Sequence, residues 1–235
     1  MTKPFDEGAQ GRLQFPRLQA YDNLSHFVTT CRGAAALSSA LGIPRLYVSK
    51  QVHGSRIAVV DSRTGELEGF DALVTVEPGI CIAVATADCV PLLLYAPDCG
   101  AVAAVHAGWR GTVLRIASET VRLMEERFGC NPRLMRAGIA PSIGPEAFEV
   151  GEEVLETFLA AGIDMSRLHY RHPATGKAHI DLKKANLFQL LEAGLQEGHI
   201  DVSDICTYSQ AGEYFSARRQ GIDCGRMLTG ILIEN

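Results

Sequence analysis

Three continuous apolar runs follow one another between residues 80 and 105, and they constrain the fold more than any other part of the sequence. The runs are Ile80–Ala87, Pro91–Tyr95 and Ala101–Val105. None of them alternates polar with apolar residues, and this pattern is typical of strands that are buried on both faces. The sequence therefore predicts a central sheet that is covered on both sides.

Further strands and helices are predicted around these runs. Strand-like segments lie at Leu46–Val48, Arg56–Val60, Asp71–Thr75, Leu134–Ile139, Ile205–Tyr208 and Met227–Ile233. Apolar residues at helical spacing predict helices over Thr112–Phe128, Glu152–Ala161 and Lys183–Ala193, each ended by a glycine. The pattern indicates an α/β protein of the mixed α+β kind, with mixed β-sheets covered by helices. We expect an irregular N-terminal arm over residues 1–25 and a single domain over residues 26–235.

Charge and hydropathy limit the partners that the chain can have. The formal net charge is −5, so no broad basic field points to a nucleic acid. The most apolar stretch, Ile80–Ala96, is interrupted by Asp88 and Pro91 and is too short to span a bilayer. The first residues contain no apolar segment typical of a signal peptide. We therefore expect a cytoplasmic protein without a membrane partner, as a monomer or a small homo-oligomer.

The cysteine pattern argues against a disulfide framework. The chain has seven cysteines, an odd number, and no Cys-x-x-Cys pair. This pattern also excludes a zinc ribbon. We expect most of the thiols to be buried as small apolar side chains.

Three metal-capable side chains stand at the ends of apolar runs: His53, Cys89 and His106. Two imidazoles and one thiolate suit a borderline ion such as Zn²⁺, with copper as an alternative, and they leave a fourth position open. The three residues are far apart in the sequence, so the fold must bring them together. Gly54 and Gly108 beside the histidines allow close backbone approach. The alternative is that each histidine is an ordinary surface or core group and that the cysteine only packs.

Other residues near these positions could contribute to a site. Asp88 could act as a general acid or base, or it could accept hydrogen bonds from backbone N–H groups in a turn. Arg110 lies where a buried strand meets a helix, a place that suits an anion such as phosphate. Phe215, Arg218 and Arg219 could hold an aromatic or anionic ligand, or they could form a solvated basic edge.

An ordered series of motifs resembles a known family over roughly residues 25–235. The motifs are Gln51–Gly54, Asp71–Thr75, Thr86–Pro91, Val105–Gly111, Gly138–Gly151, Asp181–Asn186, Cys206–Ser209 and Phe215–Arg219. The family is the multicopper polyphenol oxidoreductase laccase family, also called the peptidoglycan editing factor family or purine nucleoside phosphorylase of the laccase-domain type. One departure is the segment Cys31–Ala36, which looks shorter than in the family pattern and could alter the substrate range.

The resemblance implies a function and a set of site residues. It implies that His53, Cys89 and His106 are the ligands of a catalytic zinc ion. It further implies phosphorolysis of adenosine, inosine, guanosine and methylthioadenosine, deamination of adenosine, and a fold shared with bacterial deamidating toxins of the cysteine-hydrolase type. Asp88 would then move a proton in the reaction. The residues expected to bind the nucleoside or phosphate are Gln51, Arg110, Phe215, Arg218 and Arg219.

Two other chemistries stay open for the same residues. A copper-dependent polyphenol oxidase could use two histidines and a cysteine, but a four-copper enzyme needs about ten histidines. The chain has seven, with no His-x-His pair. A metal-free amide hydrolase acting on peptidoglycan precursors could use Cys89 as nucleophile and His106 or His53 as base.

Overall fold

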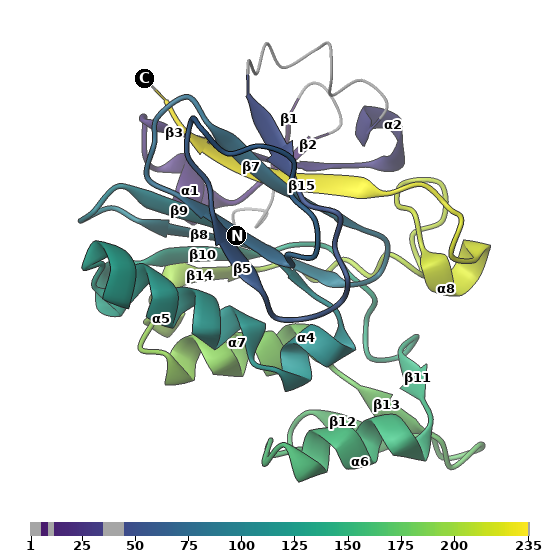
Figure 1. Cartoon of the computed structure of the whole chain (residues 1–235). Helices are drawn as coiled ribbons and strands as arrows, with labels where there is room; N and C mark the ends of the chain where they lie inside the picture. Colours follow the sequence, from purple (N-terminus) through teal and green to yellow (C-terminus); the bar gives the residue numbers. More distant parts are fainter. Residues whose placement is uncertain (1–5, 9–11, 35–44, 235) are drawn as a thin grey trace.

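Two six-stranded sheets lie face to face at the centre of the computed structural model, which describes residues 6–8, 12–34 and 45–234 (Figure 1). In the first sheet the strand order is β1 (Asp6–Gly8), β2 (Arg12–Gln14), β3 (Leu24–Thr29), β15 (Met227–Ile233), β7 (Cys81–Thr86) and β4 (Leu46–Val48). In the second sheet it is β14 (Ile200–Val202), β10 (Arg136–Ile139), β8 (Val90–Ala96), β9 (Ala101–Ala107), β6 (Ala72–Thr75) and β5 (Ile57–Val59). Both sheets mix parallel and antiparallel pairs.

Helices cover the face of the second sheet that points away from the first (Figure 1). They are α4 (Trp109–Val113), α5 (Ile116–Phe128) and α7 (Leu182–Glu192). A smaller lobe contains α6 (Glu152–Ala160) and a three-stranded sheet of β11 (Glu149–Val150), β13 (Ala178–Ile180) and β12 (His169–Arg171). The remaining helices are short: α1 (Pro16–Gln19), α2 (Cys31–Ala34), α8 (Ala217–Gln220) and the 3₁₀ turns Pro132–Leu134 and Glu197–His199.

The strands of the second sheet are buried on both faces, as their apolar runs predict. Along β8, Leu92 and Leu94 pack in the core beneath the helices, whereas Leu93 and Tyr95 pack against the first sheet. Strands β8 and β9 form an antiparallel hairpin, and every residue of the two strands is buried. The predicted mixed α+β architecture is confirmed, and the expected likeness to deamidating toxins stays a prediction.

Two predicted elements differ in the structure. The helix expected over Thr112–Phe128 is divided into α4 and α5 because Arg115 has a positive φ of 60°, which interrupts the helical backbone. Arginine does not favour this conformation, so the sequence gives no sign of the break. The strand expected over Ile205–Tyr208 is wrong. Strand β14 lies earlier, and only Cys206 in this segment forms an isolated β-bridge, with Ser142.

The described part of the predicted N-terminal arm is regular, so the expectation of an irregular arm is wrong there. Strand β2 pairs with β3, and α1 follows it directly. Leu13, Phe15 and Leu18 are buried in the core between the two sheets. A Cβ atom at Gly138 would lie 2.3 Å from the Phe15 ring, so this glycine makes room for the arm. Ala35 and Ala36 of the shortened segment lie outside the described residues.

None of the helices in the described ranges is long and apolar enough to cross a membrane.

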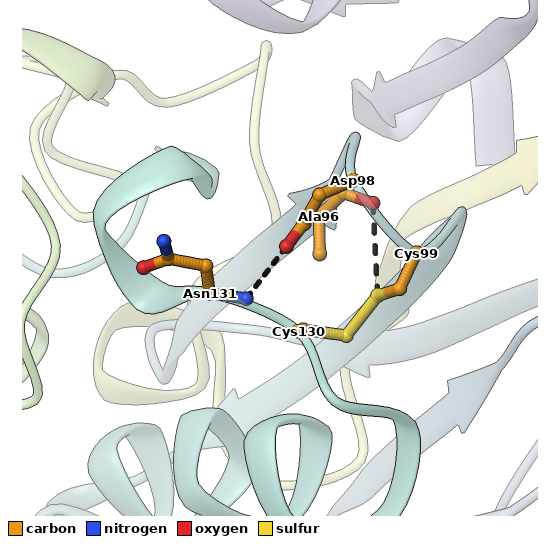
Figure 2. The surroundings of a disulfide bond; sticks show 5 residues. All are labelled: Ala96, Asp98, Cys99, Cys130 and Asn131. Carbon is orange, nitrogen blue, oxygen red and sulfur yellow. Dashed lines mark hydrogen bonds between the residues drawn. A yellow bond between two sulfur atoms is a disulfide. The ribbon is translucent and has the colours of Figure 1, made fainter.

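A disulfide joins Cys99, in the turn between β8 and β9, to Cys130, just after the end of α5 (Figure 2). The backbone N–H of Asn131 donates a 2.8 Å hydrogen bond to Asp98 Oδ2 beside it. The expectation that most cysteines are reduced packing residues is therefore wrong for this pair. Two residues 31 positions apart meet here only because α5 runs back along the hairpin, and their spacing does not reveal this contact.

We predict that the Cys99→Ser variant is less stable than the wild type by about 3–4 kcal/mol in the free energy of unfolding, since the loop that the bond closes is about 30 residues long. Urea unfolding without reductant measures the difference. Reductant should lower the wild-type midpoint and leave that of the variant unchanged. Equal midpoints for the two proteins, together with seven titratable thiols in the denatured wild type, would show that the bond does not form.

Candidate metal centre and adjoining cavity

His53, Cys89 and His106 meet where the chain passes between the two sheets. His53 lies in the connection from β4 in the first sheet to β5 in the second, and Cys89 lies in the turn from β7 to β8. His106 is on β9, beside β8. Their ligand atoms all lie within 4.8 Å of one another. The fold therefore brings together the three residues that the sequence singles out.

The backbone is strained at His53 and at Asp88, the residue before Cys89. Their φ angles are 60° and 87°, respectively. Both values fall in the left-handed region, which costs roughly 1–2 kcal/mol for a residue with a side chain. Such strain gathers at functional sites, where the surrounding structure holds it in place.

Asp71 is the residue that sequence reasoning missed. It immediately precedes β6 and its side chain has no exposed surface. One carboxylate oxygen, Oδ1, lies 2.8 Å from Nδ1 of His106 and accepts a hydrogen bond from the backbone N–H of His53. The other oxygen, Oδ2, accepts from Gly54 N at 2.7 Å. A proton on Nδ1 of His106 leaves Nε2 to act as ligand, which is the usual way in which a carboxylate fixes a metal-binding imidazole.

The polar surroundings favour a thiolate at Cys89. Burial by itself raises the pKa of this thiol, but the positive charge of His106 and hydrogen bonds from His106 and His53 outweigh burial and lower the pKa to about 6. Burial lowers the pKa of His106, whereas the Cys89 thiolate and Asp71 raise it to about 9. Without a metal these opposite shifts favour a thiolate at Cys89 paired with an imidazolium at His106. A thiolate is the form that binds a metal or attacks as a nucleophile.

Gly108 leaves room for the three side chains. A Cβ atom at this position would lie 3.2 Å from Cys89 Sγ and 3.2 Å from His53 Cδ2. The backbone of Gly108 is extended, with φ of −69°, so alanine could adopt its conformation. The need for glycine here comes from crowding against the ligand set.

The three residues open onto a cavity of about 460 Å³, within the range of about 300–1,000 Å³ that is common for small-molecule sites. Three of the side chains expected to bind substrate line it: Gln51, Arg110 and Arg218. Trp109, Phe148, Ile222 and Arg226 line it as well. Ile222 is 78% exposed, so it projects from the turn that carries it.

Gln51 and Asp88 line the cavity, but protein groups already engage their polar atoms. The Gln51 amide both donates to and accepts from the backbone of Ala85, at 2.9 and 2.7 Å. Asp88 accepts hydrogen bonds from the hydroxyls of Thr207 and Ser216, at 2.6 and 3.0 Å, and from the backbone N–H of Arg218. The three donors lie 119 to 130 positions away in the sequence, so Asp88 ties the turn that carries Cys89 to the segment 207–218 and does not act as the local turn-forming residue considered from the sequence. Its role as a general acid or base stays a prediction.

Phe215 and Arg219 are not among the residues that line the cavity. The Phe215 ring packs so closely on Gly225 that a Cβ atom there would lie 2.4 Å from it. The Arg219 guanidinium donates to the carbonyls of Thr207 at 2.9 Å, of Tyr214 at 2.7 Å and of Tyr208. Both residues therefore support the loops around the cavity, and their expected contact with a substrate stays a prediction.

Two cavity residues had a weak signal in the sequence. Phe148 belongs to the segment Gly138–Gly151, whose glycines and prolines indicate a loop that shapes a pocket. Arg226 follows Gly225 near the C-terminus. Nothing in the local pattern shows that either of them points toward the metal-capable group, because the loops that carry them are placed by tertiary contacts.

The fold and the site together define a two-sheet α+β protein with a His–Cys–His group open to a small-molecule cavity. Comparison with known proteins agrees with this description. Residues 25–234 match the family model for multi-copper polyphenol oxidoreductase laccase. The chain therefore belongs to this family, as its motifs predict.

Individual relatives extend the comparison. Purine nucleoside phosphorylase from Bacteroides thetaiotaomicron is 40% identical, over 94% of this chain and 96% of the relative. Adenosine deaminase RL5, from an unknown prokaryotic organism, is 43% identical over 87% of this chain and 81% of the relative. The crystal structure of YlmD from Geobacillus stearothermophilus superposes with a TM-score of 0.88 at 30% identity and covers 99% of both chains.

We predict that Gly108→Ala weakens zinc binding by about tenfold, because the new methyl group displaces Cys89 or His53 by a few tenths of an ångström. Competition with a chromogenic chelator measures the affinity. Gly198→Ala is the matched control, since nothing lies within 4 Å of its Cβ position. Equal affinities of the two variants would mean that the ligands tolerate the methyl group.

We also predict that alkylation of Cys89 in the metal-free protein increases with pH around a midpoint near 6. The thiolate reacts and the thiol does not, so a lowered pKa moves the reactive range downward from the value of about 8.5 of an ordinary cysteine. Iodoacetamide labelling with peptide mapping gives the profile at this residue. A midpoint near 8.5 would show that the two histidines do not stabilise the thiolate.

Proposed function

We propose that this protein is a zinc-dependent purine nucleoside enzyme. It would cleave adenosine, inosine, guanosine and methylthioadenosine by phosphorolysis, and it would deaminate adenosine. The observation that carries the proposal is the meeting of His53, Cys89 and His106 in the wall of a cavity large enough for a small organic ligand.

The donor set fits a zinc ion. Two imidazole nitrogens and a thiolate are ligands that Zn²⁺ prefers, and three protein ligands are typical of catalytic rather than structural zinc. The lowered pKa of Cys89, about 6, favours the thiolate at neutral pH and so lowers the free energy needed to deprotonate the ligand. When bound, the ion would supply Lewis acidity beside the cavity.

The chain's own residues would hold and orient the reacting groups. Asp71 keeps His106 in one tautomer and fixes the backbone of His53. Asp88 places Cys89 through its contacts with Thr207 and Ser216. Trp109 and Phe148 give the cavity aromatic surface that suits a purine ring.

The relatives support the choice of substrate. Two proteins that match most of this chain are named purine nucleoside phosphorylase and adenosine deaminase RL5. Both names point to purine nucleosides. The two reactions need different co-reactants, phosphate for one and water for the other, and a single cavity could serve both.

A second candidate function has a specific observation in its favour. Cys89, His106 and Asp71 form a chain of contacts like that of a nucleophile, a base and a carboxylate that orients the base. A metal-free amide hydrolase acting on peptidoglycan precursors would use this arrangement, with Cys89 attacking the amide carbon. The same three residues thus support a second mechanism that removal of metal can distinguish.

No observation favours multi-copper oxidase chemistry, although the family's description includes it. All seven histidines are within the described residues. Among those residues, His53, Cys89 and His106 are the one group of three or more side chains placed to hold a metal. A four-copper site needs about ten histidines, so at most a single copper ion could replace zinc here.

The test is product formation from adenosine by the purified protein, with and without phosphate, separated by chromatography. We expect adenine to form only when phosphate is present, and we expect inosine to form whether or not phosphate is present. Both products should disappear after chelation and return with Zn²⁺. Cys89→Ala should lower both rates at least about a hundredfold through loss of the ligand, whereas Cys81→Ala, a free cysteine at the opposite end of β7, should keep them.

The opposing outcomes are distinct. Amide hydrolysis that survives chelation and is lost in Cys89→Ala would support the hydrolase and contradict the zinc mechanism. Oxygen uptake on a phenol by copper-loaded protein, with no nucleoside turnover, would support the oxidase. Full activity of Cys89→Ala on adenosine would place the reaction elsewhere in the protein.

A further inference from the structure

The cavity carries an excess of positive charge. Three arginines line it, Arg110, Arg218 and Arg226, and Asp88 is the one acidic residue among its lining groups. Within the described parts of the chain, none of these arginines lies within ion-pair distance of a carboxylate. The Asp88 carboxylate accepts three hydrogen bonds from protein groups. A cavity with this balance favours an anion.

Two of the three arginines donate hydrogen bonds to nearby backbone carbonyl groups. Arg218 Nη1 donates to the carbonyls of Ala147 at 3.2 Å and Glu149 at 3.0 Å. Arg226 donates through Nη2 to Ile222 at 2.7 Å and through Nη1 to Cys224 and Gly225. These contacts tie each guanidinium to the loop beside it.

Arg110 is held in a different way. Its guanidinium lies over the Trp109 ring, with Cζ 4.3 Å from the ring centre. Among the described residues, no hydrogen bond or ion pair engages the Arg110 guanidinium, so its N–H donors are available to a ligand. Two free donors on the edge of a guanidinium match two oxygens of a phosphate. Arg110 also lies four residues after His106, which is the most buried of the three metal-capable side chains.

We propose that Arg110 binds the phosphate co-substrate, so that it serves phosphorolysis and is not needed for deamination. This inference rests on the nucleoside function proposed above, and it assigns one residue to one of the two reactions. In phosphorolysis a phosphate oxygen forms a bond to the anomeric carbon of the ribose while the bond from that carbon to the purine nitrogen breaks. The purine nitrogen takes the electron pair and, through solvent, the proton that phosphate loses.

Deamination does not involve an anionic co-reactant. The oxygen of water bonds to the purine carbon that carries the amine and the carbon–nitrogen bond breaks. One proton of the water leaves with ammonia, and the other remains on a ring nitrogen of the purine. No phosphate is present to be neutralised. A change at Arg110 should therefore separate the two reactions, whereas a change at the metal ligands should abolish both.

The test compares Arg110→Gln with the wild type in the adenosine assay. We expect the KM for phosphate in adenine formation to rise about tenfold or more, because a charged hydrogen-bonding partner is lost. Phosphate-independent inosine formation should change less than about twofold. Arg110→Lys keeps the positive charge but lacks the paired N–H donors of a guanidinium. Its KM for phosphate should therefore lie between those of the wild type and Arg110→Gln. Arg127→Gln on the exposed end of α5 is the control for loss of one positive charge.

A binding measurement gives a readout that does not depend on turnover. Trp109 is the one tryptophan in the chain, so its fluorescence reports on the stacked guanidinium. Titration with inorganic phosphate should change the emission of the wild type in a saturable way and should leave Arg110→Gln unchanged.

The outcomes separate the failure of this inference from failure of the proposed function. An unchanged phosphate KM in Arg110→Gln, with active wild-type enzyme, overturns the assignment and leaves the nucleoside function in place. An equal loss of inosine formation also overturns it, because it shows a general role in the site. Absence of any nucleoside turnover by the wild type overturns both.

Discussion

One buried carboxylate holds the functional group together. Asp71 accepts hydrogen bonds from three backbone N–H groups of the His53 loop and contacts His106 on a neighbouring strand. A carboxylate without exposed surface is costly unless every oxygen is partnered, and here the partners come from the two elements that must be aligned. Removal of the charge would release the strained loop and the imidazole together. The arrangement of metal-capable residues therefore depends on an acid that is not itself one of them.

The two sheets make this convergence possible. The chain passes from the first sheet to the second through the His53 loop and again through the Cys89 turn, and both passages lie at the same end of β8 and β9. The buried β8–β9 hairpin fixes His106 in register opposite Pro91. Because a well-packed core does not deform continuously, the relative positions of the three side chains follow from the packing of the strands.

Much of this fold could be predicted because the apolar runs of the second sheet are continuous and the helices end at glycines. Gly129, for example, has the positive φ that ends α5. The break at Arg115, the disulfide at Cys99 and the position of β14 could not be predicted, since each depends on tertiary contacts rather than local preference. The same division holds at the site. His53, Cys89 and His106 stand out as residue types. Asp71 opens the motif Asp71–Thr75, but its residue type and its place beside a strand do not show that it partners His106.

The arginines show why a residue type near a motif does not establish its role. Arg218 and Arg219 are adjacent in the sequence, yet only Arg218 reaches the cavity, while Arg219 binds three carbonyls of one loop. Their difference follows from α8, a single short turn that points successive side chains in different directions. A guanidinium that already donates to carbonyls keeps its charge but loses freedom to adapt to a ligand. Charge alone therefore cannot rank the arginines, whereas the geometry of their donors can.

The charges of the site also connect its two candidate mechanisms. Without metal, the pKa shifts of Cys89 and His106 favour a thiolate–imidazolium pair, which Asp71 supports through Nδ1 of the imidazole. A divalent cation would replace the proton of the imidazolium and bind the thiolate, so metal binding and nucleophilic attack use the same arrangement. The distinction between them lies in the surroundings. The cavity is lined with three arginines that form no ion pairs within the described ranges of the chain, and this favours chemistry with an anionic co-reactant. Phosphorolysis has such a co-reactant, whereas amide hydrolysis does not.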